Sequence, residues 1–392
     1  MSDTKKRQTQ KKQIIKIITI HGPLSRVDIA RMTGITQAIT GAIVNDLIAT
    51  NIVHVVGETG PTVPGSGRPR ILLAAVGKRE FFIGSELSER FLTFSLVDNI
   101  GQIFKQTSIR IDKTTFNQQL TGTFYYQQLQ TFINICQNYH PRAVGIALPG
   151  HFDAEAQQIV SNNPLWLSFD LTLILNKIDL PIYLENNVHC MAIRERLFND
   201  AHHDMNFIFF HVGRGLFCSS MNQGQIYGAN NFLVGEIGHN IMSPNGEYCE
   251  CGRRGCLQTY ASEGWLIKKT QLLYQKLPQS YLHQLVDNVA DVTIEVVLQA
   301  YEIGDEGVIN ILDHAMQYLA QAVSNISTLL DSQQIILHGQ IFVQPGLVAL
   351  LRQYIQQNQF LINRTAIQPV ILKPYQTCDG SDAAATMASL QY

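Results

Sequence analysis

The sequence predicts an α/β protein in which a small, basic, mostly helical N-terminal segment precedes a larger body of two lobes. Three observations support this prediction. The chain has 392 residues, more than one compact domain usually holds. Its hydrophobic fraction of 45% excludes a disordered chain and allows a large core. From about residue 81 onward, apolar runs of strand length alternate with longer runs of helical periodicity.

Charge is distributed unevenly along the chain. Residues 1–73 hold ten Lys and Arg residues and four Asp and Glu residues, a net charge of +6, so the total of −2 leaves −8 for the rest. A basic segment on an acidic body suggests that only this segment meets a polyanion. No apolar run reaches the ~18 residues that a membrane span needs, and the polar N-terminus lacks the features of a signal peptide. We therefore expect a soluble, cytoplasmic protein without membrane insertion.

The N-terminal segment has the apolar periodicity of three short helices. They are expected over residues 13–20, over residues 26–33 and from Thr36 onward. Ser25 can cap the second helix, with Asp28 completing an approximate capping box. Gly34 fits the tight turn that follows. The third helix is expected to bury one apolar stripe, made by Ile39, Ile43, Leu47 and Ile48.

A strand at residues 52–56, a loop at 57–67 and a return strand at 71–73 follow these helices, which is typical of a winged helix-turn-helix. The other side of the third helix is small and polar, so it can enter a DNA major groove. Arginines near this helix and the loop can contact phosphates, and Arg68 and Arg70 flank a rigid proline that suits a narrow minor groove. The expected DNA-contacting residues are Arg26, Arg31, Thr36, Gln37, Ala38, Gly41, Arg68 and Arg70.

The body begins with a meander of three strands and continues with alternating helices and strands. The expected strands cover residues 81–87, 91–98, 102–111, 143–150, 182–184, 207–212, 216–221 and 334–337, and the expected helices cover residues 118–139, 188–198 and 308–330. Polar residues 185–187 follow a strand directly, and α/β proteins bind ligands at the carboxyl ends of their strands. The pattern predicts two lobes and a cleft.

One histidine and three cysteines form the most specific motif of the body. His239, Cys249, Cys251 and Cys256 have the spacing His-x9-Cys-x-Cys-x4-Cys. Three thiolates and an imidazole without a spare carboxylate match a closed, structural zinc site, because a catalytic zinc needs an open position. We therefore expect about one zinc per chain.

The residues around this motif, 235–239 and 246–262, closely resemble the zinc signature of the ROK family of repressors, uncharacterised reading frames and sugar kinases. Residues 144–150, 163–166 and 184–187 resemble further segments of that family in the same order, and the N-terminal segment is similar to the winged helix-turn-helix of its repressors. The resemblance implies an actin-like (ribonuclease H-like) sugar-kinase fold behind a DNA-binding domain. The implied domains are residues 1–75, a first lobe at 76–187 completed by about 371–392, and a second lobe at 188–370.

The resemblance also predicts that phosphoryl transfer is lost. Kinase members of the family place a general-base aspartate where this chain has Asn187, and an amide cannot accept a proton at neutral pH. Their phosphate-binding Asp-x-Gly-Gly-Thr turn corresponds to residues 83–87, where the aspartate and the threonine are missing. A second phosphate segment is altered at residues 213–216. We expect a protein that is not an enzyme, with no catalytic residues.

The family's sugar contacts correspond, in this chain, to a set of amides, one glutamate and one histidine. These residues are Asn163 or its neighbour Asn162, together with Asn186, Asn187, Glu236, His239 and Gln258. Because Asn187 and Gln258 replace carboxylates with neutral hydrogen-bonding groups, a neutral sugar and an anionic sugar phosphate both fit. His239 has two ring nitrogens, so it could bind zinc with one and a sugar hydroxyl with the other.

These observations together predict a sugar-responsive transcriptional regulator, most simply a repressor of carbohydrate uptake or catabolism genes. Its partners would be an operator in double-stranded DNA, a sugar or sugar-phosphate effector, and a second copy of the chain in a homodimer or higher oligomer. Two alternatives stay open. One is a sugar kinase with an appended DNA-binding domain, and the other is a repressor controlled by a partner sugar-transport protein.

Overall fold

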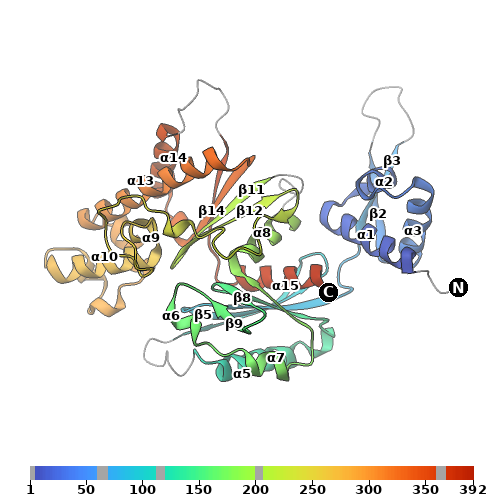
Figure 1. Ribbon diagram of the computed structural model, residues 1–392, viewed down its shortest axis with the longest axis horizontal. Helices are drawn as coiled ribbons and strands as arrows, with labels where there is room; N and C mark the ends of the chain where they lie inside the picture. The colour runs from blue at the N-terminus through green and yellow to red at the C-terminus, as the bar shows by residue number, and fades with distance from the viewer. Residues whose placement is uncertain (1–4, 60–68, 112–119, 199–205, 359–367) are drawn as a thin grey trace. The chain divides into compact units, whose positions relative to one another are not determined.

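The computed structural model describes residues 5–59, 69–111, 120–198, 206–358 and 368–392 (Figure 1). The chain divides into two compact units. Unit 1 comprises Met1–Val160, Leu165–His203 and Thr377–Tyr392, and unit 2 comprises Ser161–Pro164 and Asp204–Gln376. No helix among the described residues is both long enough and apolar enough to cross a membrane.

The N-terminal part of unit 1 contains three helices and a small antiparallel sheet in the order β1-β3-β2. Its elements are α1 (Lys5–His21), β1 (Leu24–Ser25), α2 (Arg26–Thr33), α3 (Gln37–Ala49), β2 (Val53–Thr59) and β3 (Arg70–Ala75). The predicted cap of α2 is confirmed, because the Ser25 hydroxyl accepts a hydrogen bond from the backbone N–H of Asp28. Gly34 ends that helix in the left-handed conformation at φ 69°.

The predicted apolar stripe of α3 was partly wrong. Ile39 is 41% exposed and Ile48 is only half-buried, whereas Ile43 and Leu47 are buried as expected. Thr40 and Val44 complete the buried face instead. The helix is therefore rotated relative to the expected stripe, because Thr40 is small enough to pack against the core and donates to the backbone oxygen of Ile35 at 3.4 Å.

The body of unit 1 is built on a five-stranded sheet in the order β10-β7-β4-β5-β6. β4, β7 and β10 are parallel, while β5 and β6 complete an antiparallel meander. The elements are β4 (Phe81–Leu87), β5 (Phe91–Asp98), β6 (Ile103–Arg110), α5 (Gly122–Ile135), β7 (Val144–Leu148), β8 (His151–Asp153), β9 (Gln158–Val160), α6 (Pro164–Leu167), α7 (Thr172–Lys177), β10 (Ile182–Asn186), α8 (Asn187–Phe198) and α15 (Asp379–Gln391). Phe94, Tyr125, Phe132 and Trp166 lie in its core.

Unit 2 repeats the same strand order in its own sheet, β13-β12-β11-β14-β15. A three-stranded meander again comes first, and two parallel strands are then added beside its first strand. The elements are β11 (Phe207–Val212), β12 (Leu216–Asn222), β13 (Gln225–Ile226), α9 (Gln258–Ala261), α10 (Glu263–Lys276), α11 (Leu282–Leu285), α12 (Ile294–Glu302), α13 (Glu306–Leu329), β14 (Gln334–Gly339), α14 (Pro345–Asn358) and β15 (Val370–Pro374). The apolar stripe of α13 packs into the core of this unit.

The predicted strands and helices of the body are present, with ends that differ by a few residues. The start of the helix expected at residue 118 lies outside the described residues. The division into units differs from the boundary expected at residue 188. Helix α8 packs on α15 and belongs to unit 1, whereas β15 pairs with β14 and belongs to unit 2.

Candidate functional site

The first two turns of α3 carry small, polar and apolar side chains without charge on their outer face, whereas Asp46 in the last turn is exposed and pairs with Arg7. Thr36, Gln37 and Ala38 are exposed, as the sequence predicts, and Gly41 is half-buried with open space where a Cβ would be. Ile39 adds an apolar side chain to the same turn of helix. Sequence reasoning missed Ile39 because its spacing also fits the buried stripe. An uncharged helix face of this kind can reach base edges and thymine methyl groups in a major groove.

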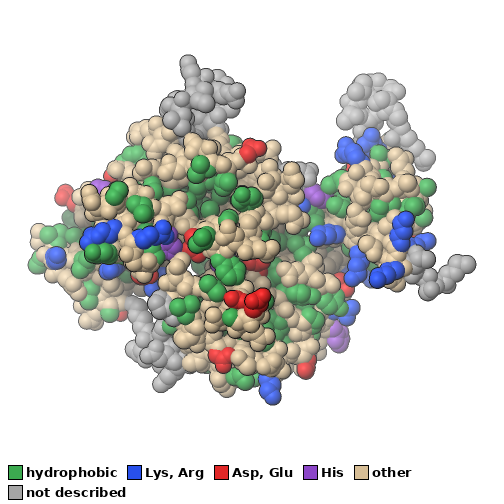
Figure 2. All heavy atoms as spheres, viewed as in Figure 1, with side chains coloured by type: hydrophobic (Ala, Val, Ile, Leu, Met, Phe, Trp, Pro, Cys, Tyr) green, Lys and Arg blue, Asp and Glu red, His purple; other side chains and the backbone are tan. Residues whose placement is uncertain are grey.

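Three described arginines lie on the neighbouring elements α2 and β3. Arg26 donates from Nη2 to Oδ1 of Asn45 on α3 at 3.0 Å, which holds its guanidinium beside the helix. The side chains of Arg31 and Arg70 are 78% and 59% exposed. Arg68 lies outside the described residues. Figure 2 shows further Lys and Arg side chains over the N-terminal helices, in agreement with the uneven charge of the sequence.

The side chain of Asp28 links α2 to β1 and β3. Its Oδ2 accepts a hydrogen bond from the Ser25 hydroxyl at 2.6 Å, and its Oδ1 lies 3.3 Å from Nη2 of Arg31 and 3.7 Å from Nη1 of Arg70. The carboxylate therefore holds an arginine of α2 and an arginine of β3 on one side of the domain. The sequence indicated only the capping role of Asp28, because Arg70 is distant in the chain.

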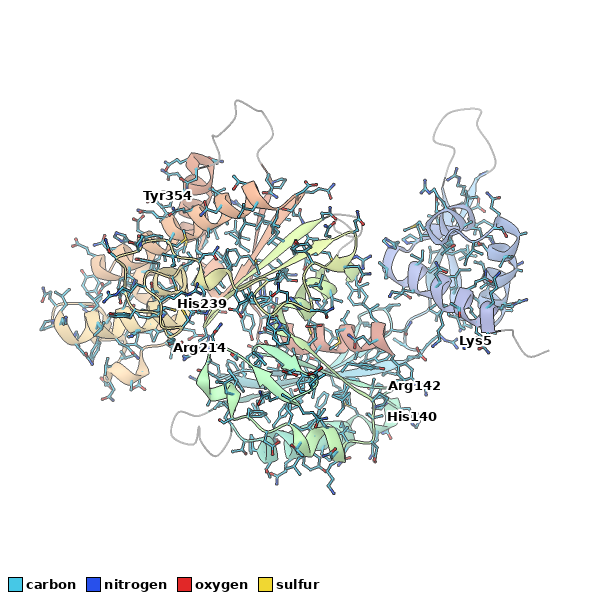
Figure 3. The ribbon with its side chains drawn as sticks, in the orientation of Figure 1. Lys5, His140, Arg142, Arg214, His239 and Tyr354 are labelled. Atoms are coloured by element: carbon cyan, nitrogen blue, oxygen red, sulfur yellow. The ribbon has the colours of Figure 1, made fainter. Side chains whose placement is uncertain are left out.

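His239, Cys249, Cys251 and Cys256 form a cluster in unit 2 that could hold a metal ion (Figure 3). The ligand atoms of the four side chains all lie within 4.8 Å of one another. Cys249 Sγ is 3.6 Å from His239 Nδ1, and Cys251 Sγ is 3.7 Å from Cys256 Sγ. These separations are much too long for a disulfide, and all seven cysteines of the chain are free.

The loop between these ligands is shaped by two glycines. Gly252 and Gly255 have φ values of +83° and +65°, in the left-handed region that favours glycine. A Cβ at Gly255 would come within 1.6 Å of the backbone oxygen of Ser243. The backbone N–H of Cys249 donates to the oxygen of Arg253 at 2.8 Å, which closes the turn that carries Cys251. The ligands are therefore positioned by the backbone and are not merely close in sequence.

Unit 2 also places two predicted sugar contacts next to the metal-ligand cluster. Glu236 Oε2 accepts from Nδ2 of Asn162 at 3.3 Å and lies 3.7 Å from Nε2 of His239. His239 thus directs Nδ1 toward the cysteines and Nε2 toward Glu236, as a bridging histidine should. Gln258 begins α9 and is half-buried, and Asn163 follows Asn162.

Unit 1 holds the other two predicted sugar contacts, at the start of α8. Asn186 is buried, and its Oδ1 accepts from the backbone N–H groups of Val188 and His189 while its Nδ2 donates to the oxygen of Gly150 at 3.1 Å. Most of its hydrogen-bonding capacity therefore serves the helix start. Asn187 is half-buried and donates from Nδ2 to Oε1 of Glu86 at 3.2 Å.

Glu86 is a site residue that sequence reasoning missed. It is 4% exposed near the end of β4, and burial raises the pKa of its carboxyl to about 7. The hydrogen bond from Asn187 lowers that pKa and the nearby Asp379 raises it, but both effects are smaller than the effect of burial. Residues 83–87, which correspond in sequence to the phosphate turn of family kinases, are not a turn: Ile83 and Leu87 are strand residues, paired with Leu96 and Leu92 of β5, and their side chains are fully buried in the core.

The ROK family model matches residues 86–390. The chain belongs to the ROK family. This confirms the resemblance found in the sequence around the cysteines. The xylose repressor of Bacillus spizizenii is 25% identical over 338 residues, which cover 86% of this chain and 83% of that protein.

Two solved structures show the extent of the fold similarity. A ROK family transcriptional regulator, described as a homolog of the E. coli MLC protein, matches with a TM-score of 0.74 at 22% identity and covers 98% of this chain and 96% of its own. A ROK family glucokinase from Streptomyces griseus, solved with glucose and AMPPNP, matches with a TM-score of 0.68 at 19% identity and covers 79% of this chain and 99% of its own. The mixed α/β fold of this chain is thus shared with both regulators and kinases of the family.

Proposed function

We propose that this protein is a sugar-responsive, DNA-binding transcriptional repressor that acts in the cytoplasm. In this proposal the N-terminal helices and the β2–β3 hairpin form a winged helix-turn-helix, and α3 reads an operator. The observation that carries the proposal is the exposed, uncharged start of α3 together with exposed arginines of α2 and β3, in a chain whose body belongs to the ROK family. The xylose repressor and the regulator structure support it, because their similarity extends over most of this chain.

Each group of the interface has a defined role in this proposal. Gln37 would pair with an adenine, and Thr36, Ala38 and Ile39 would contact thymine methyl groups. Arg26, Arg31 and Arg70 would contact phosphates, and Gly41 would allow close approach of the helix. Arg68 would join them, although it lies outside the described residues. Two such domains in a homodimer would read the two halves of a symmetric operator.

The test is a mobility-shift titration of the full chain on DNA from upstream of its own gene. We expect preferential binding of that DNA over unrelated DNA of equal length. Arg31→Ala should weaken binding to both DNAs and reduce the salt slope by about 1 unit, since one phosphate contact is lost. Arg352→Ala, which removes an exposed arginine of α14, is the matched control and should leave both quantities unchanged. Equal affinity for the two DNAs would refute the proposal.

We also propose that the cluster of one histidine and three cysteines binds one structural zinc ion. With Zn–S bonds of about 2.3 Å and Zn–N bonds of about 2.0–2.1 Å, a tetrahedral site has S–S and S–N edges of about 3.8 and 3.6 Å. The observed Cys251–Cys256 and Cys249–His239 separations, 3.7 and 3.6 Å, support this assignment. The ion would fix the loop between His239 and Cys256, and thereby orient Glu236 through His239 Nε2.

The effector in this proposal is a sugar. Its candidate contacts are Asn162, Asn163, Glu236, His239 and Gln258 in unit 2, and Asn186 and Asn187 in unit 1. A ligand changes the operator affinity only by the difference between its affinities for the DNA-binding and DNA-free states of the protein. A sugar that binds the DNA-free state more tightly would therefore release the operator.

A sugar kinase with an appended DNA-binding domain is the second candidate function, and the similarity to the glucokinase structure favours it. The amide at Asn187 speaks against it, because an amide cannot accept a proton from a sugar hydroxyl at neutral pH as a carboxylate can. A coupled assay for ADP release with hexoses and amino sugars distinguishes the two functions. A repressor controlled by a sugar-transport protein would instead bind DNA without responding to any sugar.

A further inference from the structure

Glu86 and Asn187 meet because three parallel strands of unit 1 end at one edge of the sheet. Glu86 of β4 pairs in register with Ala147 of β7, and Ala147 pairs with Glu185 of β10. Asn187 follows β10 directly as the first residue of α8. The Glu86 carboxylate and the Asn187 amide therefore reach each other past β7, in which a small alanine stands between them. Their hydrogen bond spans 101 residues of sequence.

Two glycines bring helix α15 against the same edge. Gly84 and Gly145 are paired in the sheet, and a Cβ at either position would come within about 2 Å of a backbone oxygen of α15. The helix therefore packs directly on the strands, with Asp379 and Gly380 at its start beside Glu86. A Cβ at Gly380 would lie 2.1 Å from the Glu86 carboxylate, so the glycine makes room for that carboxylate.

The resulting environment is unfavourable for a second negative charge. Glu86 is buried, Asp379 acts on it electrostatically, and Asp382 is also buried on the same helix. Arg194 of α8 lies 3.8 Å from Asp382 and pairs with that carboxylate. With a pKa of about 7, Glu86 is mostly ionised at pH 8. A hydroxyl can donate to this carboxylate, whereas a phosphate dianion would meet it at short range with little water to screen the repulsion.

We propose that Glu86 selects the charge of the effector, so that the sugar site admits a neutral sugar and excludes the corresponding sugar phosphate. This inference rests on the proposed function, in which the sugar contacts Asn187. Asn187 Nδ2 donates to Glu86 Oε1 at 3.2 Å, so a ligand group that binds at Asn187 lies close to the Glu86 carboxylate. Glu86 thus acts as a specificity-determining residue. Although Asn187 is neutral, the carboxylate of Glu86 keeps a negative charge at this end of the site.

The test compares pairs of ligands at pH 8 by isothermal titration calorimetry of the full chain. The pairs are glucose, N-acetylglucosamine and N-acetylmannosamine, each with its 6-phosphate. We expect at least one neutral sugar to bind, and its phosphate to bind at least about tenfold more weakly. Glu86→Gln preserves the size of the side chain and an acceptor for Asn187, and it should reduce that ratio to about threefold or less.

Glu302→Gln, which removes the same charge from an exposed position on α12, is the control and should leave the ratio unchanged. Should Glu86→Gln fail to fold by circular dichroism, Asp379→Asn provides a second variant, and it should also reduce the ratio. The inference about Glu86 is overturned if a sugar phosphate binds the wild type as tightly as its parent sugar, or if the folded variants leave the affinity ratio of sugar to sugar phosphate unchanged. Either result leaves the proposed sugar response standing. Binding of no ligand by any of these proteins overturns the proposed sugar response, and this inference with it.

Discussion

Replacing Glu86 with glutamine should change how the stability of unit 1 depends on pH. In the unfolded chain the carboxyl titrates near 4.5, and in the folded protein burial raises its pKa to about 7. Well below pH 4.5 the carboxyl is protonated in both states, so its burial does not lower the free energy of unfolding through this titration. Between about pH 4.5 and pH 7 the unfolded state releases this proton while the folded state keeps it, so the wild type loses stability over this range and loses no more above it. A shift of about 2.5 units corresponds to about 3 kcal/mol.

Glu86→Gln removes this titration. The variant should therefore be more stable than the wild type at pH 8, by up to about 3 kcal/mol, and should differ little from it at pH 5. The other titratable groups near Glu86 are Asp379, Cys378 and Cys190, and all of them remain in the variant. Their contribution largely cancels when the two proteins are compared at each pH.

Urea unfolding followed by tryptophan fluorescence measures this difference. The chain has two tryptophans, and Trp166 lies in the core of unit 1 whereas Trp265 belongs to unit 2. A Trp265→Phe background confines the signal to unit 1, and Glu302→Gln in that background controls for a change in net charge. An equal stability difference at pH 5 and pH 8, or a variant that is less stable than the wild type at pH 8, would refute the reasoning.

Three further predictions concern the metal, the reaction and the packing of α15. Elemental analysis of the wild type should find about one zinc ion per chain; Cys251→Ser should lose this zinc and Cys378→Ser should retain it, and equal zinc in both variants would contradict the assignment. Asn187→Asp should give no sugar phosphorylation in a coupled ADP assay, because the phosphate turn stays absent; turnover above background would show that one carboxylate suffices. Gly84→Ala should lower the unfolding free energy of unit 1 by more than about 2 kcal/mol in urea, since its Cβ would lie 1.9 Å from the Ser381 oxygen; an unchanged midpoint would contradict this close approach.

The sequence predicts what is local in the chain. The Ser25 cap, the Gly34 turn and the cysteine cluster depend on residues a few positions apart, so their spacing is informative. The apolar stripe of α3 was placed partly wrongly because Ile39 and Thr40 are adjacent and only the packed structure shows which of them faces the core.

Contacts that depend on strand register could not be predicted from the spacing of residues in the sequence. Glu86 and Asn187 meet only because β4, β7 and β10 are parallel and aligned. The approach of α15 depends on the pairing of Gly84 with Gly145, which no periodicity indicates. Sequence reasoning therefore noted the residues that differ from a kinase, and it could not predict that the Glu86 carboxylate is buried beside Asn187.

The central claim is that a sugar-kinase fold without phosphoryl transfer serves as a sensor that controls a DNA-binding domain. Fluorescence anisotropy of labelled DNA from upstream of the gene, titrated with the full chain in the presence of each sugar of the panel, tests this claim most directly. The account predicts tight, sequence-preferring binding that at least one neutral sugar weakens about tenfold or more. Binding that is indifferent to both DNA sequence and every sugar would contradict it.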